Sequence, residues 1–206
     1  MQGSIEKALI KEGKSFVGVD EVGRGCIAGP VYVAAVALDF VKLLKLPKST
    51  RSLIRDSKTL SRSQRRKILP IIESLSTDCQ VAFSSVREIE QQGIVPAINE
   101  AIKRALDHCQ NKYDLLLFDG KHTLPFYRRP QKAIIKGDHL CYCIAAASIV
   151  AKEARDAFMI DQSREYPGFE FESNVGYGTK KHRDHLFRVG PTPIHRKNFA
   201  PVKDMI

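Results

Sequence analysis

Short apolar runs rich in β-branched residues recur along the chain, and each is bounded by glycine or polar residues. They comprise Ser15–Val19, Gly29–Leu38, Gln80–Val86, Tyr113–Phe118 and Lys132–Lys136. Runs of this length and composition are typical of strands that are buried in a sheet. The pattern therefore predicts three strands early in the chain and two more in its second half.

Longer amphipathic or alanine-rich stretches lie between these runs and predict helices. Ser61–Leu69 reads as a capped basic helix, and Pro70 predicts a break or kink there. Ile94–Cys109 carries its apolar residues on one helical face. The stretch from Leu140 to about Met159 has no proline or glycine, and its small residues would let it lie close to a sheet. The order of elements predicts an α/β fold, a mixed sheet flanked by helices.

Length and composition suit a single domain with a small appended element. The chain has 206 residues, of which 43% are hydrophobic, enough for a real core. No apolar run approaches the ~20 residues of a membrane-spanning helix, and the N-terminus does not resemble a secretory signal. We therefore expect a cytoplasmic monomer with no membrane partner.

Cysteine usage agrees with a reducing compartment. The five cysteines are an odd number and read as free thiols: Cys26, Cys79, Cys109, Cys141 and Cys143. Cys141 and Cys143 lie near His139, but their spacing matches no common structural zinc pattern. A zinc site is therefore not expected.

The charge balance is strongly basic. Lys and Arg total 33 against 23 acidic residues, a formal net charge of +10. Such an excess favours a polyanionic partner, because neutralised phosphates release condensed counterions. A basic surface without a nucleic-acid partner is the alternative, and charge alone does not separate the two.

Carboxylates follow three of the predicted strands. Asp20 and Glu21 follow the first, Asp119 the fourth and Asp138 the fifth. Strand ends in one sheet would bring these side chains together, and divalent cations such as Mg²⁺ or Mn²⁺ would relieve their repulsion. Neighbouring strand residues face opposite sides, so we expect the backbone to leave the strand at Glu21. The alternative is that the acids only form turns, as Asp-Gly pairs commonly do.

Five motifs in order resemble the type 2 ribonuclease H family, and they span residues 15–202. They are Asp20-Glu21-Val22-Gly23-Arg24-Gly25, Asp56-Ser57-Lys58-x-Leu60, Lys136-Gly137-Asp138 with the following Ile144–Lys152 and Arg155-Asp156, Gly176-Tyr177-Gly178-Thr179-x-x-His182, and Gly190-Pro191 with His195-Arg196, Phe199 and Pro201-Val202. The resemblance implies a single ribonuclease H-like catalytic domain over residues 1–206, in which residues 160–206 form a C-terminal helical extension that binds substrate. It also implies an endoribonuclease that cuts RNA in RNA–DNA hybrids and 5′ of ribonucleotides embedded in duplex DNA.

The same resemblance implies roles for particular residues. Asp20, Glu21, Asp119 and Asp138 would be catalytic ligands of two Mg²⁺ or Mn²⁺ ions roughly 4 Å apart, and the products would carry 3′-hydroxyl and 5′-phosphate ends. The substrate contacts would be Gly23, Arg24, Gly25, Lys58, Tyr177, His182 and Arg196. The glycine-flanked Arg24 turn would bracket the 2′-hydroxyl, Tyr177 would read the sugar beyond it, and Lys58, His182 and Arg196 would contact phosphates.

Other chemistry-bearing residues read as structural. Asp156 is expected to pair with a neighbouring base, and Ser148 and Lys152 to support the long helix. His108, His122 and His185 have no visible partner and are expected to be structural. Two rival functions remain: another nuclease with a related acidic centre, and a nucleic-acid-binding module without activity. The Gly23–Gly25 and Gly176–Gly178 turns argue against the first, and the four carboxylates argue against the second.

Overall fold

A computed structural model describes residues 2–121 and 123–206 of the chain. His122, expected to be structural, lies outside the described residues. The strands of the described part form one five-stranded sheet in the order β3-β2-β1-β4-β5. Their bounds are β1 Phe16–Val22, β2 Val31–Leu38, β3 Ser76–Ser84, β4 Leu115–Asp119 and β5 Gln131–Ile134. β2 pairs antiparallel with β1 and β3, whereas β4 pairs parallel with β1 and β5, so the predicted mixed sheet is confirmed.

Helices occupy most of the remaining chain. They are α1 Ser4–Lys11, α2 Phe40–Lys45, α3 Lys48–Arg51, α4 Arg62–Leu75, α5 Val86–Gln92, α6 Ile94–Asp107, α7 Gly137–Leu140, α8 Tyr142–Glu165, α9 Phe171–Asn174 and α10 Lys180–Val189, with short 3₁₀ turns at Ser57–Thr59 (η1) and Val202–Met205 (η2).

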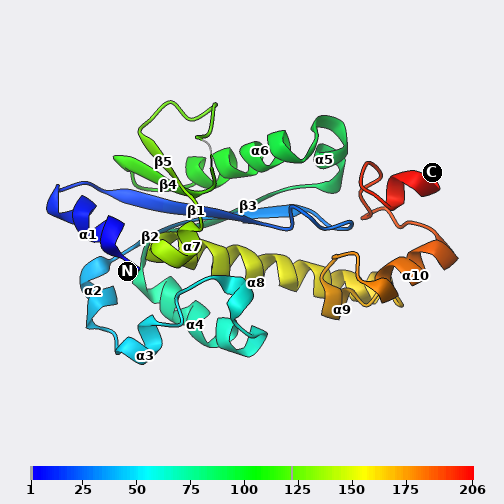
Figure 1. Cartoon of the computed structure of the whole chain (residues 1–206), viewed down its shortest axis with the longest axis horizontal. Coiled ribbons are helices and arrows are strands. Elements are labelled where there is room, and N and C mark those ends of the chain that lie inside the picture. Colours follow the sequence, from blue (N-terminus) through cyan, green and yellow to red (C-terminus); the bar gives the residue numbers. More distant parts are fainter. Residues whose placement is uncertain (1, 122) are drawn as a thin grey trace.

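The sheet is the middle of three layers. Helices α5 and α6 cover one face, and α8 runs along the other with α4 beside it (Figure 1). Apolar side chains from β1, β2 and α6 form one core cluster, and those from β1, β2 and α8 form another. The small residues Ala145–Ala147 of α8 are fully buried. They let the helix lie close to the sheet, as their size predicts.

Two local predictions were wrong. Pro70 lies inside α4, which continues to Leu75 without a break. Pro70 and Arg66, whose carbonyl would lose the helical hydrogen bond, are both exposed, so water can satisfy that carbonyl. The first strand also does not end before Glu21, because β1 continues to Val22 in register with β2.

The C-terminal segment packs against the end of α8. Residue 160, where the extension was expected to begin, lies inside α8, which ends at Glu165. Beyond it, Phe169, Phe171, Leu186 and Val202 form a third apolar cluster that includes Ile27, Ala28 and Met159. The extension therefore has a core of its own that closes over the loop after β1. Among the described helices, none is long and apolar enough to cross a membrane.

Candidate active site

The strand β1 presents its two acidic residues to opposite faces of the sheet. Val17 and Val19 lie in the cluster on the α6 side, whereas Phe16 and Val22 lie in the cluster on the α8 side. Because side chains alternate along a strand, Asp20 faces α8 and Glu21 faces α6. The expectation that the backbone leaves the strand at Glu21 was therefore wrong, since Glu21 pairs with Val33 in the ladder.

Three of the four predicted carboxylates meet on one side of the sheet. Asp20, Asp119 and Asp138 each offer an oxygen, and these oxygens lie within 4.8 Å of one another. Asp119 ends β4, the parallel neighbour of β1, and Val19 pairs with Phe118 directly before the two aspartates. Asp138 comes from the short helix α7, whose Gly137 N–H donates to Asp119 Oδ1 at 2.8 Å. Glu21 lies outside this group of three.

Burial and like charge strain this acidic group. Burial raises the pKa of the Asp20 carboxyl well above its usual range, and the charges of Glu21 and Asp119 raise it further. Burial also raises the pKa values of Glu21 and Asp138, with the charge of Asp119 adding to both. Within the described chain, no Lys or Arg forms an ion pair with Asp20, Asp119 or Asp138. A divalent cation would remove this repulsion.

The donor set suits a hard divalent cation. Three carboxylates supply only oxygen ligands, which Mg²⁺ and Mn²⁺ prefer, and no thiol or imidazole belongs to this group. Cys141 and Cys143, by contrast, are buried free thiols. They belong to neither cluster of possible metal ligands found among the described residues.

A second cluster extends the site and was missed by sequence reasoning. Asp56 and His139 join Asp138 in a group whose ligand atoms lie within 4.8 Å. His139 Nε2 lies 3.5 Å from Asp56 Oδ2, and the charge of Asp56 raises the pKa of Asp138. Asp56 opens η1, and its Oδ1 accepts the N–H of Lys58 at 2.9 Å. The Asp56-Ser57-Lys58 motif was the available signal, although only its lysine was singled out.

Lys58 is exposed beside these acids, as its predicted role requires. Burial raises the pKa values of Glu21 and Asp138, and the positive charge of Lys58 partly offsets both rises, which places the ammonium group near both carboxylates. A cation in this position can approach a phosphate without desolvation.

The turn after β1 brings backbone groups next to the acids. Cys26 N–H donates to the carbonyl of Gly23, so Arg24 and Gly25 form the tip of a tight turn. Arg24 is exposed, and its guanidinium lies 3.6 Å from Glu21 Oε1. Gly23 has φ +91°, and a Cβ there would overlap the guanidinium of Arg155. The first glycine is therefore required by both its backbone conformation and its surroundings.

Arg155 of α8 holds this turn and a second one together. Its side chain is fully buried and donates to three carbonyls: Pro30 at 2.9 Å, Ala28 at 2.9 Å and Val175 at 2.6 Å. Val175 has φ +44°, a left-handed conformation that a β-branched residue rarely adopts. Such strain persists only where surrounding contacts hold it, and the bond to Arg155 is one of them.

Tyr177 follows this strained residue and is 38% exposed. Gly176 precedes it with φ +86°, and the Gly176 carbonyl accepts the N–H groups of Ile27 and Ala28. The Tyr177 turn is thus joined to the loop that carries Gly23–Gly25. Tyr177 therefore lies on the surface beside the same loop, as the two flanking glycines indicate.

The structure differs from the expected phosphate contacts of His182 and Arg196. Both side chains are fully buried. His182 bonds the Tyr177 carbonyl and the ring of His195, whereas Arg196 donates to the carbonyls of Gly29 and Arg24. In this conformation neither side chain is accessible to a phosphate, because both are fully buried. Their positive or polar groups instead shape the two turns.

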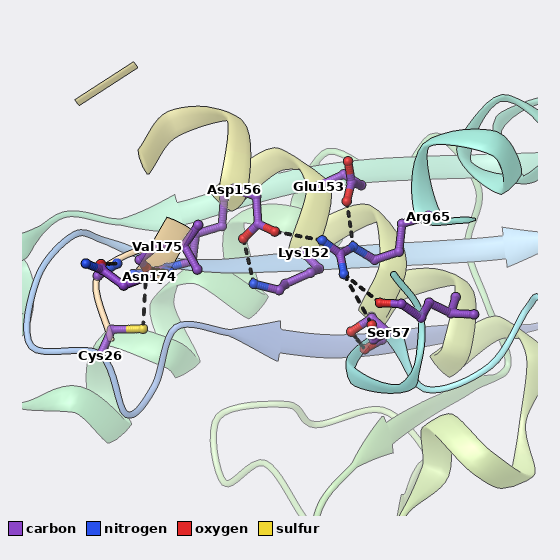
Figure 2. Close-up of polar contacts among 12 residues, drawn as sticks. Cys26, Ser57, Arg65, Lys152, Glu153, Asp156, Asn174 and Val175 are labelled. Carbon is purple, nitrogen blue, oxygen red and sulfur yellow. Dashed lines mark hydrogen bonds and ion pairs between the residues drawn. The ribbon is translucent and has the colours of Figure 1, made fainter. Parts of the chain in front are cut away.

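Asp156 pairs with bases, as expected. Arg65 Nη2 lies 2.9 Å from Asp156 Oδ2, and Lys152 Nζ lies 2.6 Å from Asp156 Oδ1. Arg65 also contacts Glu153 at 2.6 Å and donates to the Leu60 carbonyl (Figure 2). One arginine of the basic helix α4 is therefore buried and fixes the η1 segment to α8. The expected supporting role of Ser148 agrees with its 2.9 Å hydrogen bond to Ser57 Oγ.

A cleft of about 660 Å³ lies on the α6 side of the acids. Glu21, Arg24 and Asp119 line it together with apolar residues of α6, β4 and the loop after β4, among them Ile98, Phe118 and Leu124. Of the four predicted carboxylates, Glu21 and Asp119 line this cleft, whereas Asp20 and Asp138 do not.

Comparison with known proteins decides which family this geometry belongs to. Residues 17–202 match the family model described as Ribonuclease HII. The chain belongs to the ribonuclease HII family. Ribonuclease HII of Ruegeria sp. (strain TM1040) is 42% identical over 204 residues, covering 98% of this chain and 86% of the relative. Ribonuclease HII of Dehalococcoides mccartyi is 40% identical, covering 97% and 93%.

Solved structures share the fold. Ribonuclease H2 from Pyrococcus horikoshii OT3 superimposes with a TM-score of 0.76 at 23% identity, covering 93% of this chain and 96% of that one. RNase HII from Archaeoglobus fulgidus, solved in complex with PCNA, gives 0.71 at 22% identity over 90% and 95%. Bst-RNase HIII in complex with Mn²⁺ gives 0.67 at 20% identity over 92% and 68%.

Family membership establishes the general activity. The chain is a metal-dependent nuclease, a phosphodiester hydrolase of the ribonuclease H type that acts on RNA–DNA hybrids. The ribonuclease H-like fold expected from the motifs is confirmed.

Proposed function

We propose that the chain hydrolyses the RNA strand of hybrids and also cuts on the 5′ side of single ribonucleotides in duplex DNA, leaving 3′-hydroxyl and 5′-phosphate ends. The observation that carries this proposal is the placement of the three-aspartate group beside two joined turns. One turn is Gly23–Gly25, directly after β1, and the other presents Tyr177.

Asp20, Asp119 and Asp138 are the proposed metal ligands, with Glu21 completing the acidic site. Two Mg²⁺ or Mn²⁺ ions bound there would supply the activated water and stabilise the leaving 3′ oxygen. Asp20 and Asp138 support this assignment, because both are buried, both have raised pKa values, and neither forms an ion pair with a Lys or Arg of the described chain. Glu21 faces the α6 side, so it would approach a metal from a different direction than Asp20.

The two turns supply the proposed RNA recognition. Arg24 and Gly25 are exposed at the end of β1, and main-chain groups of this turn would meet a 2′-hydroxyl, which can both donate and accept hydrogen bonds. Tyr177 presents a partly exposed ring beside it, and a flat ring suits a deoxyribose that lacks the 2′ oxygen. Lys58 and Arg24 are exposed cations for phosphates, and the extension from residue 160 would form the far side of the substrate site.

The test uses three fluorescent duplexes: a long RNA–DNA hybrid, DNA with one embedded ribonucleotide, and plain DNA. We expect Mg²⁺-dependent cleavage of the first two, incision 5′ of the ribonucleotide, and complete loss in EDTA. Asp138→Asn should abolish cleavage while duplex binding persists. Asp161→Asn makes the same change at an exposed position of α8 and should retain activity. Cleavage of plain DNA, or a fully active Asp138→Asn variant, would refute the proposal.

Tyr177 is tested by comparing substrates. Tyr177→Ala should lower cleavage at the single ribonucleotide more than cleavage of the long hybrid, because only the first depends on a deoxyribose contact. Phe187→Ala removes another exposed aromatic ring from the same extension and serves as the control. Equal loss on both substrates with Tyr177→Ala would contradict the sugar-reading role.

A further inference from the structure

Two histidines from separate C-terminal motifs meet in the interior beneath the Tyr177 turn. His182 lies in the first turn of α10, and His195 lies in the loop after that helix. Both rings are fully buried, and their Nε2 atoms lie 3.0 Å apart. The rings of Phe169 and Phe171 surround them, with centroid separations of 4.9 to 5.9 Å.

The hydrogen-bond partners assign one tautomer to each ring. Thr192 N–H donates to His195 Nδ1 at 3.0 Å, so that nitrogen carries no proton. The proton of neutral His195 then resides on Nε2 and is donated to His182 Nε2. His182 consequently carries its proton on Nδ1, which lies 2.8 Å from the Tyr177 carbonyl. Two backbone groups therefore agree on the directions of these bonds: the Thr192 N–H, which can only donate, and the Tyr177 carbonyl, which can only accept.

Both rings are neutral at neutral pH, as this chain of bonds requires. Burial lowers the pKa of His195 to about 4, and burial also lowers the pKa of His182. Two protonated Nε2 atoms 3.0 Å apart would repel, so a neutral pair is the stable arrangement.

The hydrogen bonds of the histidine pair lead to Tyr177, the residue proposed to read the sugar. The Tyr177 carbonyl accepts His182 Nδ1–H and the N–H of Thr179, and these bonds orient the peptide that follows Tyr177. The His195 side of the pair is fixed to the loop after β1. His195 forms an isolated bridge with Ala28, and the neighbouring Arg196 N–H donates to the Ile27 carbonyl at 2.8 Å.

We propose that His182 and His195 form a tautomer-fixed relay that holds Tyr177 in position against the Gly23–Gly25 loop, so that they are positioning residues for ribonucleotide recognition. Neither ring reaches the substrate surface, and each acts through the next group in the relay. This role rests on the proposed reading of the sugar by Tyr177, and it assigns the two buried histidines a purpose other than phosphate contact.

The first test measures the tautomers directly in the whole chain. Nitrogen-15 spectra of histidine-labelled protein at pH 8 should show the Nδ1–H tautomer for His182 and the Nε2–H tautomer for His195, assigned with single His→Gln variants. The opposite tautomer on either ring would overturn the relay. This outcome does not depend on whether Tyr177 reads the sugar.

The second test measures the preference for a single ribonucleotide, defined as kcat/KM on the embedded ribonucleotide divided by kcat/KM on the long hybrid. His195→Phe keeps the ring volume but leaves His182 Nε2 without its donor. We expect the preference to fall about fivefold, the effect of one hydrogen bond of about 1 kcal/mol. His185→Phe changes another ring that contacts Phe169 and should leave the preference unchanged.

A conservative variant separates positioning from general packing. In His182→Asn the amide nitrogen takes the place of Nδ1 and can donate to the Tyr177 carbonyl without help from His195. His182→Asn should therefore retain the preference, His182→Phe should lose it, and adding His195→Phe to His182→Asn should cause no further loss. Equal losses on both substrates, or additive losses in the double variant, would overturn the proposal.

The two proposals fail differently. If Tyr177→Ala leaves the preference unchanged, the sugar-reading role is wrong whatever the histidine variants do. If Tyr177→Ala lowers the preference but His195→Phe does not, the relay alone is wrong.

Discussion

Replacing Asp20 by asparagine should stabilise the metal-free chain while removing its response to metal. The Asp20 carboxylate is buried beside Asp119 and Asp138, with ligand oxygens within 4.8 Å. Two unit charges at that separation repel by about 3.5 kcal/mol at an effective dielectric of about 20. The protein avoids part of this cost by the raised pKa of Asp20. Asparagine removes the charge and can still accept the Glu21 N–H, so we expect a gain of about 1 to 3 kcal/mol at pH 8.

The gain in the free energy of unfolding caused by Asp20→Asn should increase with pH. Because the folded-state pKa of Asp20 is raised, the wild-type chain is most stable below the unfolded pKa and loses stability as pH rises through the folded value. The asparagine variant lacks this titration. The difference between the two chains should therefore be small near pH 4 and largest at pH 8, both in EDTA.

Metal should reverse the order of stability. At a Mn²⁺ concentration of about 1,000 times the dissociation constant, the wild-type chain should gain about 4.1 kcal/mol, and Asp20→Asn should gain little. Urea unfolding in EDTA and in Mn²⁺ measures each value, with Asp161→Asn as the surface control. If Asp20→Asn is less stable than the wild type at pH 8 in EDTA, the acidic group is not electrostatically strained and the reasoning fails.

Three further predictions follow from single contacts. Gly23→Ala should lower the free energy of unfolding by more than about 1 to 2 kcal/mol, the cost of a left-handed alanine, because the added Cβ would overlap Arg155. Gly13→Ala is the control: Gly13 has φ +68° and open space around it, so this variant measures the cost of the left-handed backbone alone. Equal shifts of the melting temperature in the two variants would argue against the overlap. Arg65→Met should lower the free energy of unfolding in urea by about 3 to 5 kcal/mol, because Glu153 and Asp156 lose the guanidinium group that pairs with both. The same change at exposed Arg66 should alter the free energy of unfolding by no more than about 0.5 kcal/mol. Lys58→Ala should weaken binding of the RNA–DNA hybrid and reduce the slope of log affinity against log salt concentration by about 1. Lys67→Ala, at an exposed position of α4, is the control. An unchanged slope for Lys58→Ala would exclude a phosphate contact.

Local pattern was sufficient for most elements. The runs around Val17, Val33 and Leu117 predicted strands because β-branched and apolar residues there are bounded by turn formers. The alanine-rich stretch around Ala146 predicted a long helix against the sheet. The prediction of a break at Pro70 failed because it depended on solvent exposure, which the local pattern does not give. Pro70 is tolerated inside α4 because it lies on the exposed side of the helix.

The candidate site was predictable as a set of residues but not as a geometry. The motifs placed Asp20, Glu21, Asp119 and Asp138 in one site, yet the strand alternation of β1 separates Glu21 from the other three. Asp56 was missed because it is distant from Asp138 in the chain and only tertiary packing brings the two together, whereas His139 directly follows Asp138 but was considered only as a neighbour of Cys141 and Cys143.

The sequence by itself determined the strands, the helices, the ribonuclease H-like order of motifs and the acids that follow the strands, because these depend on neighbours along the chain. Tertiary structure alone decided which charged and polar side chains face water. Arg65, Arg155, His182 and Arg196 look like surface groups in the sequence, but the fold buries all four. Burial depends on which distant segments pack over a residue, and that information is absent from its local pattern.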